Sequence, residues 1–108
     1  MKTCFISGPI TGHDDYQEYF GDAVDFVQHS LGYIPVSPVE ISNPIMEQGL
    51  DLTWDQWMKI DLAYLDFCDC IFMLKGWETS KGATQEHAYA LEHGKKIIYE
   101  TSLSEADV

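Results

Sequence analysis

Apolar residues follow two alternating patterns along the chain: short continuous runs, and longer segments in which they recur every three or four positions. A short apolar run is typical of a buried strand, and the longer period is typical of an amphipathic helix. The runs predict strands at residues 2–6, 33–36, 70–74 and 96–99. The periodic segments predict helices from about 15 to 31, from 53 to 67 and from the turn at 80–82 to 94.

The order of these elements, β-α-β-α-β-α-β, predicts an α/β fold. Right-handed crossovers between successive strands give a parallel sheet with helices on both faces. The first strand is mostly apolar and suits a central place, whereas Pro35 and Pro38 favour an edge for the second strand. We expect a flavodoxin-like or Rossmann-like three-layer sandwich with about four parallel strands in the order 2-1-3-4.

The segment 37–52 does not fit either pattern. It contains two prolines and Gly49, which predict a long loop. Loops of this length in a compact domain tend to be functional covers or disordered segments. Met46 and Leu50 can close over a ligand or pack against a partner subunit, and partner packing is slightly favoured.

Two small-residue turns follow predicted strands. Ser7-Gly8-Pro9-Ile10 comes directly after the first strand, and Ser80-Lys81-Gly82-Ala83 opens the helix after the third. In the expected strand order, both turns lie at the carboxyl edge of the sheet, where open α/β sheets bind ligands. The two turns are therefore expected to face each other across one cleft.

Two acids stand out from the pattern. Glu86 lies in the first turns of the helix after the third strand, either as a site residue or as a structural acid that complements the helix dipole. Asp61 lies four positions after Trp57 and four before Leu65, on the inward face of its helix. An acid on an inward face is costly unless it is paired or used, so we expect Asp61 to take part in a site.

Composition excludes some classes of protein. The 108 residues fit a single domain over 1–108, with 100–108 expected to be a tail. The chain has 18 acids against six lysines, with a net charge of −12, so we do not expect it to bind nucleic-acid polymers. An acidic protein can also imitate DNA and occupy a DNA-binding partner, a reading that the even spread of acids among apolar positions disfavours.

No apolar run approaches the roughly 20 residues that span a bilayer, and the first residues lack a signal-peptide layout. We therefore expect no membrane association. Cys4, Cys68 and Cys70 are expected to be small buried residues of a reduced cytoplasmic protein, because their spacing fits no zinc site. We expect neither a metal nor a cofactor.

Three features together resemble the nucleoside 2-deoxyribosyltransferase superfamily, and more narrowly the small DUF4406 proteins often found in phage genomes. They are the stretch from Phe5 to Gly12, the inward Asp61, and the stretch from Ser80 to Glu86 followed by Ala88-Tyr89-Ala90. The resemblance covers about positions 2 to 99. It implies the substrate-binding residues Phe5, Ser7, Gly8, Pro9, Ile10, Ser80, Gly82 and Ala83.

The resemblance also implies a reaction: cleavage or exchange at the N-glycosidic bond of a nucleoside or nucleoside 5′-monophosphate. In that family a glutamate matched by Glu86 attacks the anomeric carbon, and an aspartate matched by Asp61 meets the departing base. A carboxylate nucleophile beside a second acid suits this chemistry. Family members assemble as dimers or larger, so we expect a homodimer or higher homo-oligomer.

Two positions depart from the deoxyribosyltransferase pattern. Ser80 stands where those enzymes keep an aspartate, and it is more similar to the serine with which related nucleotide hydrolases receive a phosphate; plain turn chemistry is an equal alternative. Phe5 stands where the family commonly has a tyrosine bonded to the catalytic glutamate. Tyr89 and Tyr64 are candidate substitutes, and a non-catalytic nucleotide-binding module of the same fold is the alternative function.

Overall fold

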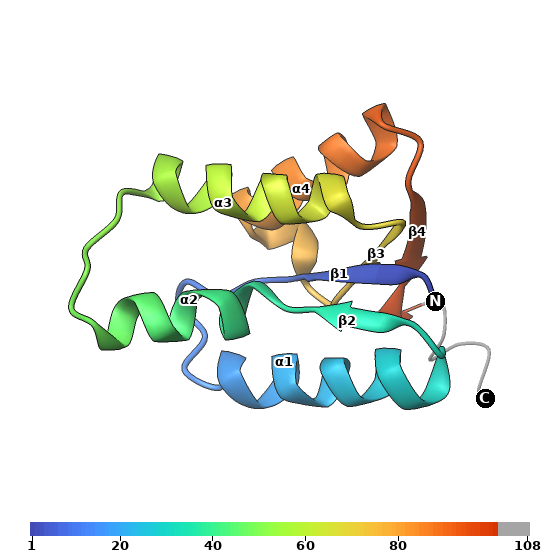
Figure 1. Ribbon diagram of the computed structural model, residues 1–108, viewed down its shortest axis with the longest axis horizontal. Coiled ribbons are helices and arrows are strands. Elements are labelled where there is room, and N and C mark those ends of the chain that lie inside the picture. The colour runs from blue at the N-terminus through green and yellow to red at the C-terminus, as the bar shows by residue number, and fades with distance from the viewer. Residues whose placement is uncertain (102–108) are drawn as a thin grey trace.

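A computed structural model of the protein describes residues 1–101, which form an α/β sandwich (Figure 1). Its elements are β1 (Thr3–Ser7), α1 (Tyr16–Asp25), a π-helical continuation η1 (Phe26–Ser30), β2 (Ile34–Val36), α2 (Pro38–Glu47), α3 (Trp54–Phe67), β3 (Cys70–Met73), a 3₁₀ turn η2 (Trp77–Thr79), α4 (Lys81–Glu92) and β4 (Lys96–Tyr99). The described strands form one parallel sheet in the order β2-β1-β3-β4. The expected fold class and strand order are confirmed, and positions 102–108 of the expected tail lie outside the described residues.

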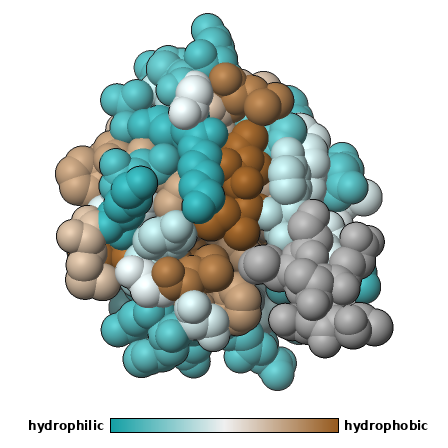
Figure 2. Space-filling view, turned by 90° about the vertical axis from the view of Figure 1, so that its right-hand side faces the viewer, coloured by the Kyte–Doolittle hydropathy of each residue, from teal (hydrophilic) through white to brown (hydrophobic). Residues whose placement is uncertain are grey.

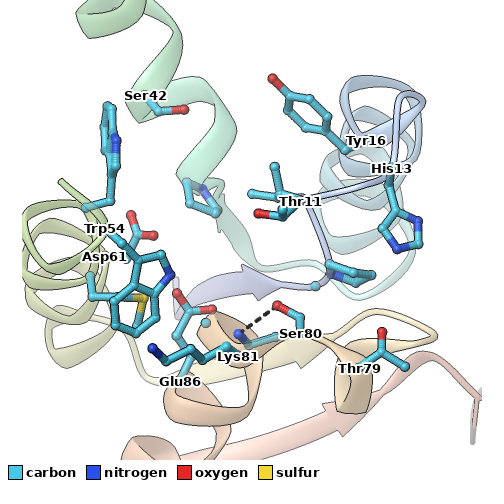
Figure 3. Close-up of a pocket in the computed structure, with 18 of the residues that line it drawn as sticks. Thr11, His13, Tyr16, Ser42, Trp54, Asp61, Thr79, Ser80, Lys81 and Glu86 are labelled. Atoms are coloured by element: carbon cyan, nitrogen blue, oxygen red, sulfur yellow. Dashed lines mark hydrogen bonds between the residues drawn. The ribbon is translucent and has the colours of Figure 1, made fainter. Parts of the chain in front are cut away.

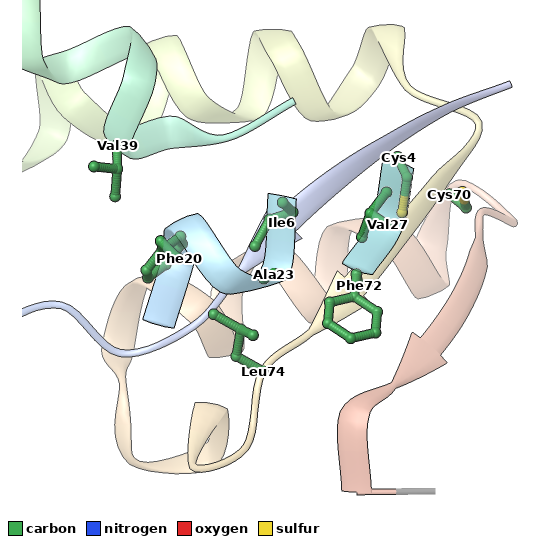
Figure 4. Packing of buried hydrophobic residues seen from close by; sticks show 9 residues of the cluster. All are labelled: Cys4, Ile6, Phe20, Ala23, Val27, Val39, Cys70, Phe72 and Leu74. Carbon is green, nitrogen blue, oxygen red and sulfur yellow. The ribbon is translucent and has the colours of Figure 1, made fainter. Parts of the chain in front are cut away.

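The two faces of the sheet bury separate hydrophobic clusters because successive strand residues point in opposite directions. Cys4 and Ile6 of β1 point to the face that α1 covers, where they pack with Phe20 (Figure 4). Phe5 points to the other face, where it packs with Leu65 of α3. In Figure 1, α1 lies on one side of the sheet and α3 and α4 lie on the other.

The segment predicted as a loop over 37–52 is helical in its first part, so that prediction is wrong there. The helix α2 begins at Pro38, and proline suits this first helical position because its missing N–H would have no intrahelical partner. Pro44 lies inside the helix and is tolerated there, although an internal proline removes one backbone hydrogen bond. Met46 and Leu50 are 53% and 55% exposed.

The predicted start of α3 is confirmed. Thr53 and Gln56 form a capping box: Thr53 Oγ1 accepts from the backbone N–H of Gln56 at 3.2 Å, and Gln56 Oε1 accepts from that of Thr53 at 2.9 Å. This cap fixes where α3 begins. Together α2, the connection 48–53 and the start of α3 extend beyond the carboxyl edge of the sheet (Figure 1). The opposite end, near the amino terminus, shows a hydrophobic strip in the middle and smaller hydrophobic patches above and below it, with hydrophilic residues between them (Figure 2).

Candidate active site

A cavity of about 590 Å³ lies at the carboxyl edge of the sheet. This volume is in the range of small-molecule sites. The wall of the cavity consists of Gly8, Pro9, Ile10, Thr11, His13, Tyr16, Pro38, Ser42, Met46, Trp54, Trp57, Met58, Asp61, Thr79, Ser80, Lys81, Gly82, Ala83 and Glu86. Segments after β1 and β3 therefore meet at one cavity, as the sequence predicts.

The turn after β1 is tightly packed. A Cβ atom added to Gly8 would lie 2.8 Å from the Cβ and Cδ1 atoms of Leu74, so this position requires glycine if Leu74 is to stay in place. The hydroxyl of Tyr19 donates to the carbonyl oxygen of Pro9 and ties the turn to α1. Pro9 and Ile10 are held in this way in the cavity wall.

The turn before α4 places a helix start in the wall. Ser80 is the N-cap, and its Oγ accepts from the backbone N–H of Ala83 at 3.1 Å (Figure 3). The hydroxyl keeps its own hydrogen for donation to a ligand, because an oxygen that accepts one bond can still donate. The first backbone N–H groups of a helix have no intrahelical partners, and they and the helix dipole favour an anion.

Glu86 projects from α4 into the cavity wall and is only 5% exposed. Its Oε1 accepts a 2.6 Å hydrogen bond from the hydroxyl of Ser7. Burial raises the pKa of Glu86 from its ordinary 4.5 to about 8; the Ser7 bond acts in the opposite direction, and the nearby charge of Asp61 adds to the rise. The ionisation of Glu86 therefore depends on Ser7 and Asp61.

Asp61 reaches the same cavity from α3. Burial raises the pKa of its carboxyl from 3.8 to about 6. In Figure 3, Asp61 and Trp54 lie on one side of the cavity and Thr79 and Ser80 on the other, with Glu86 between them. Two acids from different helices thus face one cavity, and each holds its proton more tightly than in water.

Lys81 and Trp54 approach each other at the edge of the cavity. The Lys81 Nζ lies 4.2 Å from the centroid of the Trp54 ring, within the range of a cation–π contact. Lys81 is the first residue of α4 and Trp54 is the first residue of α3. The contact therefore joins the starts of the two helices that carry the acids.

Most predicted site residues line this cavity: Gly8, Pro9, Ile10, Asp61, Ser80, Gly82, Ala83 and Glu86. Phe5 and Ser7 do not. Phe5 is fully buried in the hydrophobic cluster on the α3 side, so its ring packs in the core and does not form the cavity wall. Ser7 is also fully buried, and its hydroxyl bonds Glu86.

Neither tyrosine considered as a substitute for Phe5 bonds Glu86. The hydroxyl of Tyr89 donates to Asp66 at 2.7 Å, and Tyr64 is an exposed residue of α3.

Sequence reasoning missed the aromatic and sulfur-containing part of the wall. Trp54, Trp57 and Met58 belong to the apolar side of the helix predicted over 53–67, and this periodicity does not distinguish a cavity wall from a core. They lie three to seven positions before Asp61, about one and two turns away along α3. The available signal was Asp61 itself, an acid within the apolar face of α3. Residues that surround such an acid on a helix face share its cavity, so they could have been predicted to line the site.

Among residues 1–101, no group of three or more His, Cys, Asp or Glu side chains is arranged to hold a metal ion. None of the described helices has the length and apolar character needed to cross a bilayer.

Comparison with solved structures places the fold. The chain superposes on the 2-desoxiribosyltransferase from Leishmania mexicana with a TM-score of 0.66 and 21% sequence identity, over 92% of this chain and 63% of that one. This chain therefore shares the α/β fold of that enzyme and spans less than two thirds of its length.

The family follows from the sequence comparison. The family described as Domain of unknown function (DUF4406) matches residues 2–99, and the chain belongs to it. No curated protein matches the chain.

Proposed function

We propose that this cavity cleaves or exchanges the N-glycosidic bond of a nucleoside or nucleoside 5′-monophosphate. The observation that carries the proposal is the pair of acids in one cavity, Glu86 buried and Asp61 held in a desolvated position on the facing helix. Acid pairs with raised pKa values in a cavity are typical of catalytic sites. The likeness to a 2-desoxiribosyltransferase supports the substrate class.

In this mechanism the ionised carboxylate of Glu86 attacks the anomeric carbon of the sugar. The bond between sugar and base breaks, its electron pair leaves with the base, and Asp61 gives its proton to the departing nitrogen. The glycosyl ester of Glu86 is then opened by water, which makes the protein a hydrolase, or by a second base, which makes it a transferase. Asp61 accepts a proton from the attacking group in this step.

The rate of the proposed reaction depends on which of the two acids, Glu86 or Asp61, carries the proton. The mechanism needs Glu86 ionised and Asp61 protonated, but burial raises the pKa of Glu86 to about 8 and that of Asp61 only to about 6. In the singly protonated pair, the proton therefore lies mostly on Glu86 and not on Asp61. Any contact that stabilises the carboxylate of Glu86 therefore increases the productive fraction.

The arrangement of the wall supports one orientation of a nucleotide. The sugar lies at Glu86, and the base lies toward Asp61 and Trp54. A 5′-phosphate lies at the start of α4, where Ser80 and the backbone N–H groups can receive it. Ser80 is a neutral residue and does not repel a phosphate, which favours a monophosphate over a nucleoside.

Lys81 is the first residue of α4, the helix start at which the phosphate is proposed to lie. Replacing it by alanine is expected to raise KM for a nucleoside 5′-monophosphate about tenfold, because the positive charge that attracts the phosphate to this helix start is lost. KM for the corresponding nucleoside should stay within about twofold, since a nucleoside presents no phosphate to this lysine. Steady-state kinetics on the two substrates measure the difference. Lys59→Ala, at an exposed lysine of α3 outside the cavity wall, is the matched control. An equal rise for both substrates would place the phosphate elsewhere.

The proposed activity is tested by incubating the protein with deoxyribo- and ribonucleosides and their 5′-monophosphates, with and without a second free base. Chromatography then detects the released or exchanged base. Release without an acceptor indicates a hydrolase, and product only with an acceptor indicates a transferase. Thermal stabilisation by a nucleotide without any product would show the alternative, a non-catalytic nucleotide-binding module of the same fold.

We also propose that the protein forms a homodimer or higher homo-oligomer through the part that extends beyond the sheet. Met46, Leu50 and Trp54 are exposed there, and two of them line the cavity. A second copy could cover these side chains and close the cavity, because exposed apolar clusters at a rim are typical of interfaces. Light scattering after size exclusion is expected to give a multiple of 12.3 kDa, and Leu50→Asp should shift it toward the monomer. A monomer at high concentration would contradict the proposal.

We propose a reducing compartment, the cytoplasm, for the protein. Cys4, Cys68 and Cys70 are free and buried. Cys4 and Cys70 lie opposite each other on β1 and β3 without a disulfide between them, which fits a compartment that keeps thiols reduced.

A further inference from the structure

A buried serine holds the proposed nucleophile. The hydroxyl of Ser7 donates to Oε1 of Glu86 at 2.6 Å, across 79 positions of sequence. Ser7 is completely buried and Glu86 almost so. A donor to a carboxylate in such surroundings makes a short, strong hydrogen bond. The described hydrogen bonds involve Oε1 and leave Oε2 of Glu86 without a partner among residues 1–101.

The backbone of β1 fixes the position of this hydroxyl. The carbonyl oxygen of Ser7 accepts from the backbone N–H of Leu74 at 2.8 Å, and Ser7 pairs with Met73 in the sheet. Because Gly8 has no side chain, the chain after β1 can lie close to Leu74, where a Cβ atom would collide. The hydroxyl therefore extends from a rigid strand and not from a loop.

Strand geometry also explains why Ser7, and not Phe5, is placed to donate a hydrogen bond to Glu86. Side chains two positions apart in a strand lie on the same face. Phe5 and Ser7 thus both point toward α3 and α4, but Ser7 is two positions nearer the carboxyl edge at which Glu86 lies. Phe5 has no hydroxyl and packs in the core.

We propose that Ser7 is a positioning residue for Glu86, which holds Oε1 and leaves Oε2 as the oxygen that attacks the sugar. This inference rests on the proposed function and goes beyond it, because it assigns separate roles to the two oxygens of one carboxylate. The hydrogen bond also favours the ionised form of Glu86. In a pair that shares one proton, Ser7 thereby moves that proton toward Asp61, where the departing base needs it.

The first test is the kinetics of Ser7→Ala. We expect kcat to fall about 10- to 100-fold, the range for loss of a buried hydrogen bond to a charged group, with KM changed less than about threefold. The acidic limb of the pH–rate profile should move to higher pH, because the carboxylate of Glu86 loses a donor. Ser7→Thr keeps the hydroxyl and is expected to recover most of the rate. A purely structural role would not shift the pH profile.

Ser37→Ala is the matched control. Ser37 is also buried, and its hydroxyl has no hydrogen-bond partner among the described residues. It lies outside the cavity wall. The loss of this hydroxyl is expected to leave kcat and the pH profile unchanged.

A second measurement does not depend on activity. The carboxyl of Glu86, labelled with ¹³C, is titrated by NMR in the wild type and in Ser7→Ala, with Glu86→Gln assigning the signal. The titration midpoint is expected to move to higher pH in Ser7→Ala; Ser7→Cys, with a weaker donor, serves in its place if the alanine variant does not fold. An unchanged midpoint together with an unchanged kcat overturns the inference. If no substrate releases a base but the midpoint moves, the proposed function fails while the control of Glu86 by Ser7 is supported.

Discussion

Glu86→Gln is expected to lower the rate of base release by about 10³-fold or more, the usual loss when a covalent nucleophile is removed. The amide has nearly the shape of the carboxyl and can still accept the hydrogen bond from Ser7. It cannot attack an anomeric carbon, however, or balance the positive charge that develops on the sugar. Binding should persist, so a nucleotide should still raise the unfolding temperature of the variant. Base release is followed by chromatography, and binding by thermal unfolding.

The matched control is Glu92→Gln, which makes the same chemical change at an exposed position of the same helix. Its rate should stay within about twofold of the wild type, since surface substitutions away from a site have small effects. A Glu86→Gln protein that retains a tenth of the activity would contradict the nucleophile assignment. The chemistry would then have to start from Asp61 or from water.

The topology could be predicted because the two central strands, β1 and β3, are buried almost throughout. The run from Cys70 to Met73 is buried at every position, and a strand of this kind appears in the sequence as a continuous apolar run. The edge position of β2 could be predicted from Pro35, which cannot donate to a neighbouring strand. These signals are local to each strand. The right-handedness of the crossovers between successive strands then limits the possible topologies of the sheet.

The helix α2 could not be predicted by the same reasoning. Pro38 and Pro44 are breaker signals in sequence, but Pro38 begins the helix, and the first turn of α2 packs into the core through Val39. Tertiary packing of this kind overrides local propensity. A prediction that relies on prolines as helix breakers therefore assigns a loop to the segment that forms α2.

The site was predicted to the level of helix faces and no further. Asp61 could be found because its position between apolar neighbours fixes which way it points, and Glu86 because it lies in the first turns of the helix after the third strand. The bond between Ser7 and Glu86 could not, because it depends on the distance between a strand end and a helix that are 79 positions apart. Periodicity places a side chain on a face, whereas a hydrogen bond requires a placement within a few tenths of an ångström.

The second large effect concerns stability, which is expected to fall as the pH rises through the range in which Glu86 ionises. Burial raises the pKa of Glu86 from 4.5 to about 8 in the folded protein. Between these values the folded chain holds a proton that the unfolded chain has lost. The free energy of unfolding therefore decreases with pH, and the stabilisation is fully present below about pH 4.5 and is lost above about pH 8.

Between pH 6.5 and 8.5, this loss should amount to about 2 kcal/mol in the wild type, obtained by integrating the proton difference over the window. Asp61 adds little in this window, because its pKa of about 6 lies below it. Urea unfolding at several pH values measures the free energy, and Glu86→Gln is the decisive comparison because the amide does not ionise. The variant should show a nearly flat profile over the same window and should be the more stable protein at pH 8.5. A wild-type profile as flat as that of the variant would mean that Glu86 ionises as it does in water. The raised pKa would then no longer support the assignment of Glu86, which would rest on its place in the cavity wall and its hydrogen bond to Ser7.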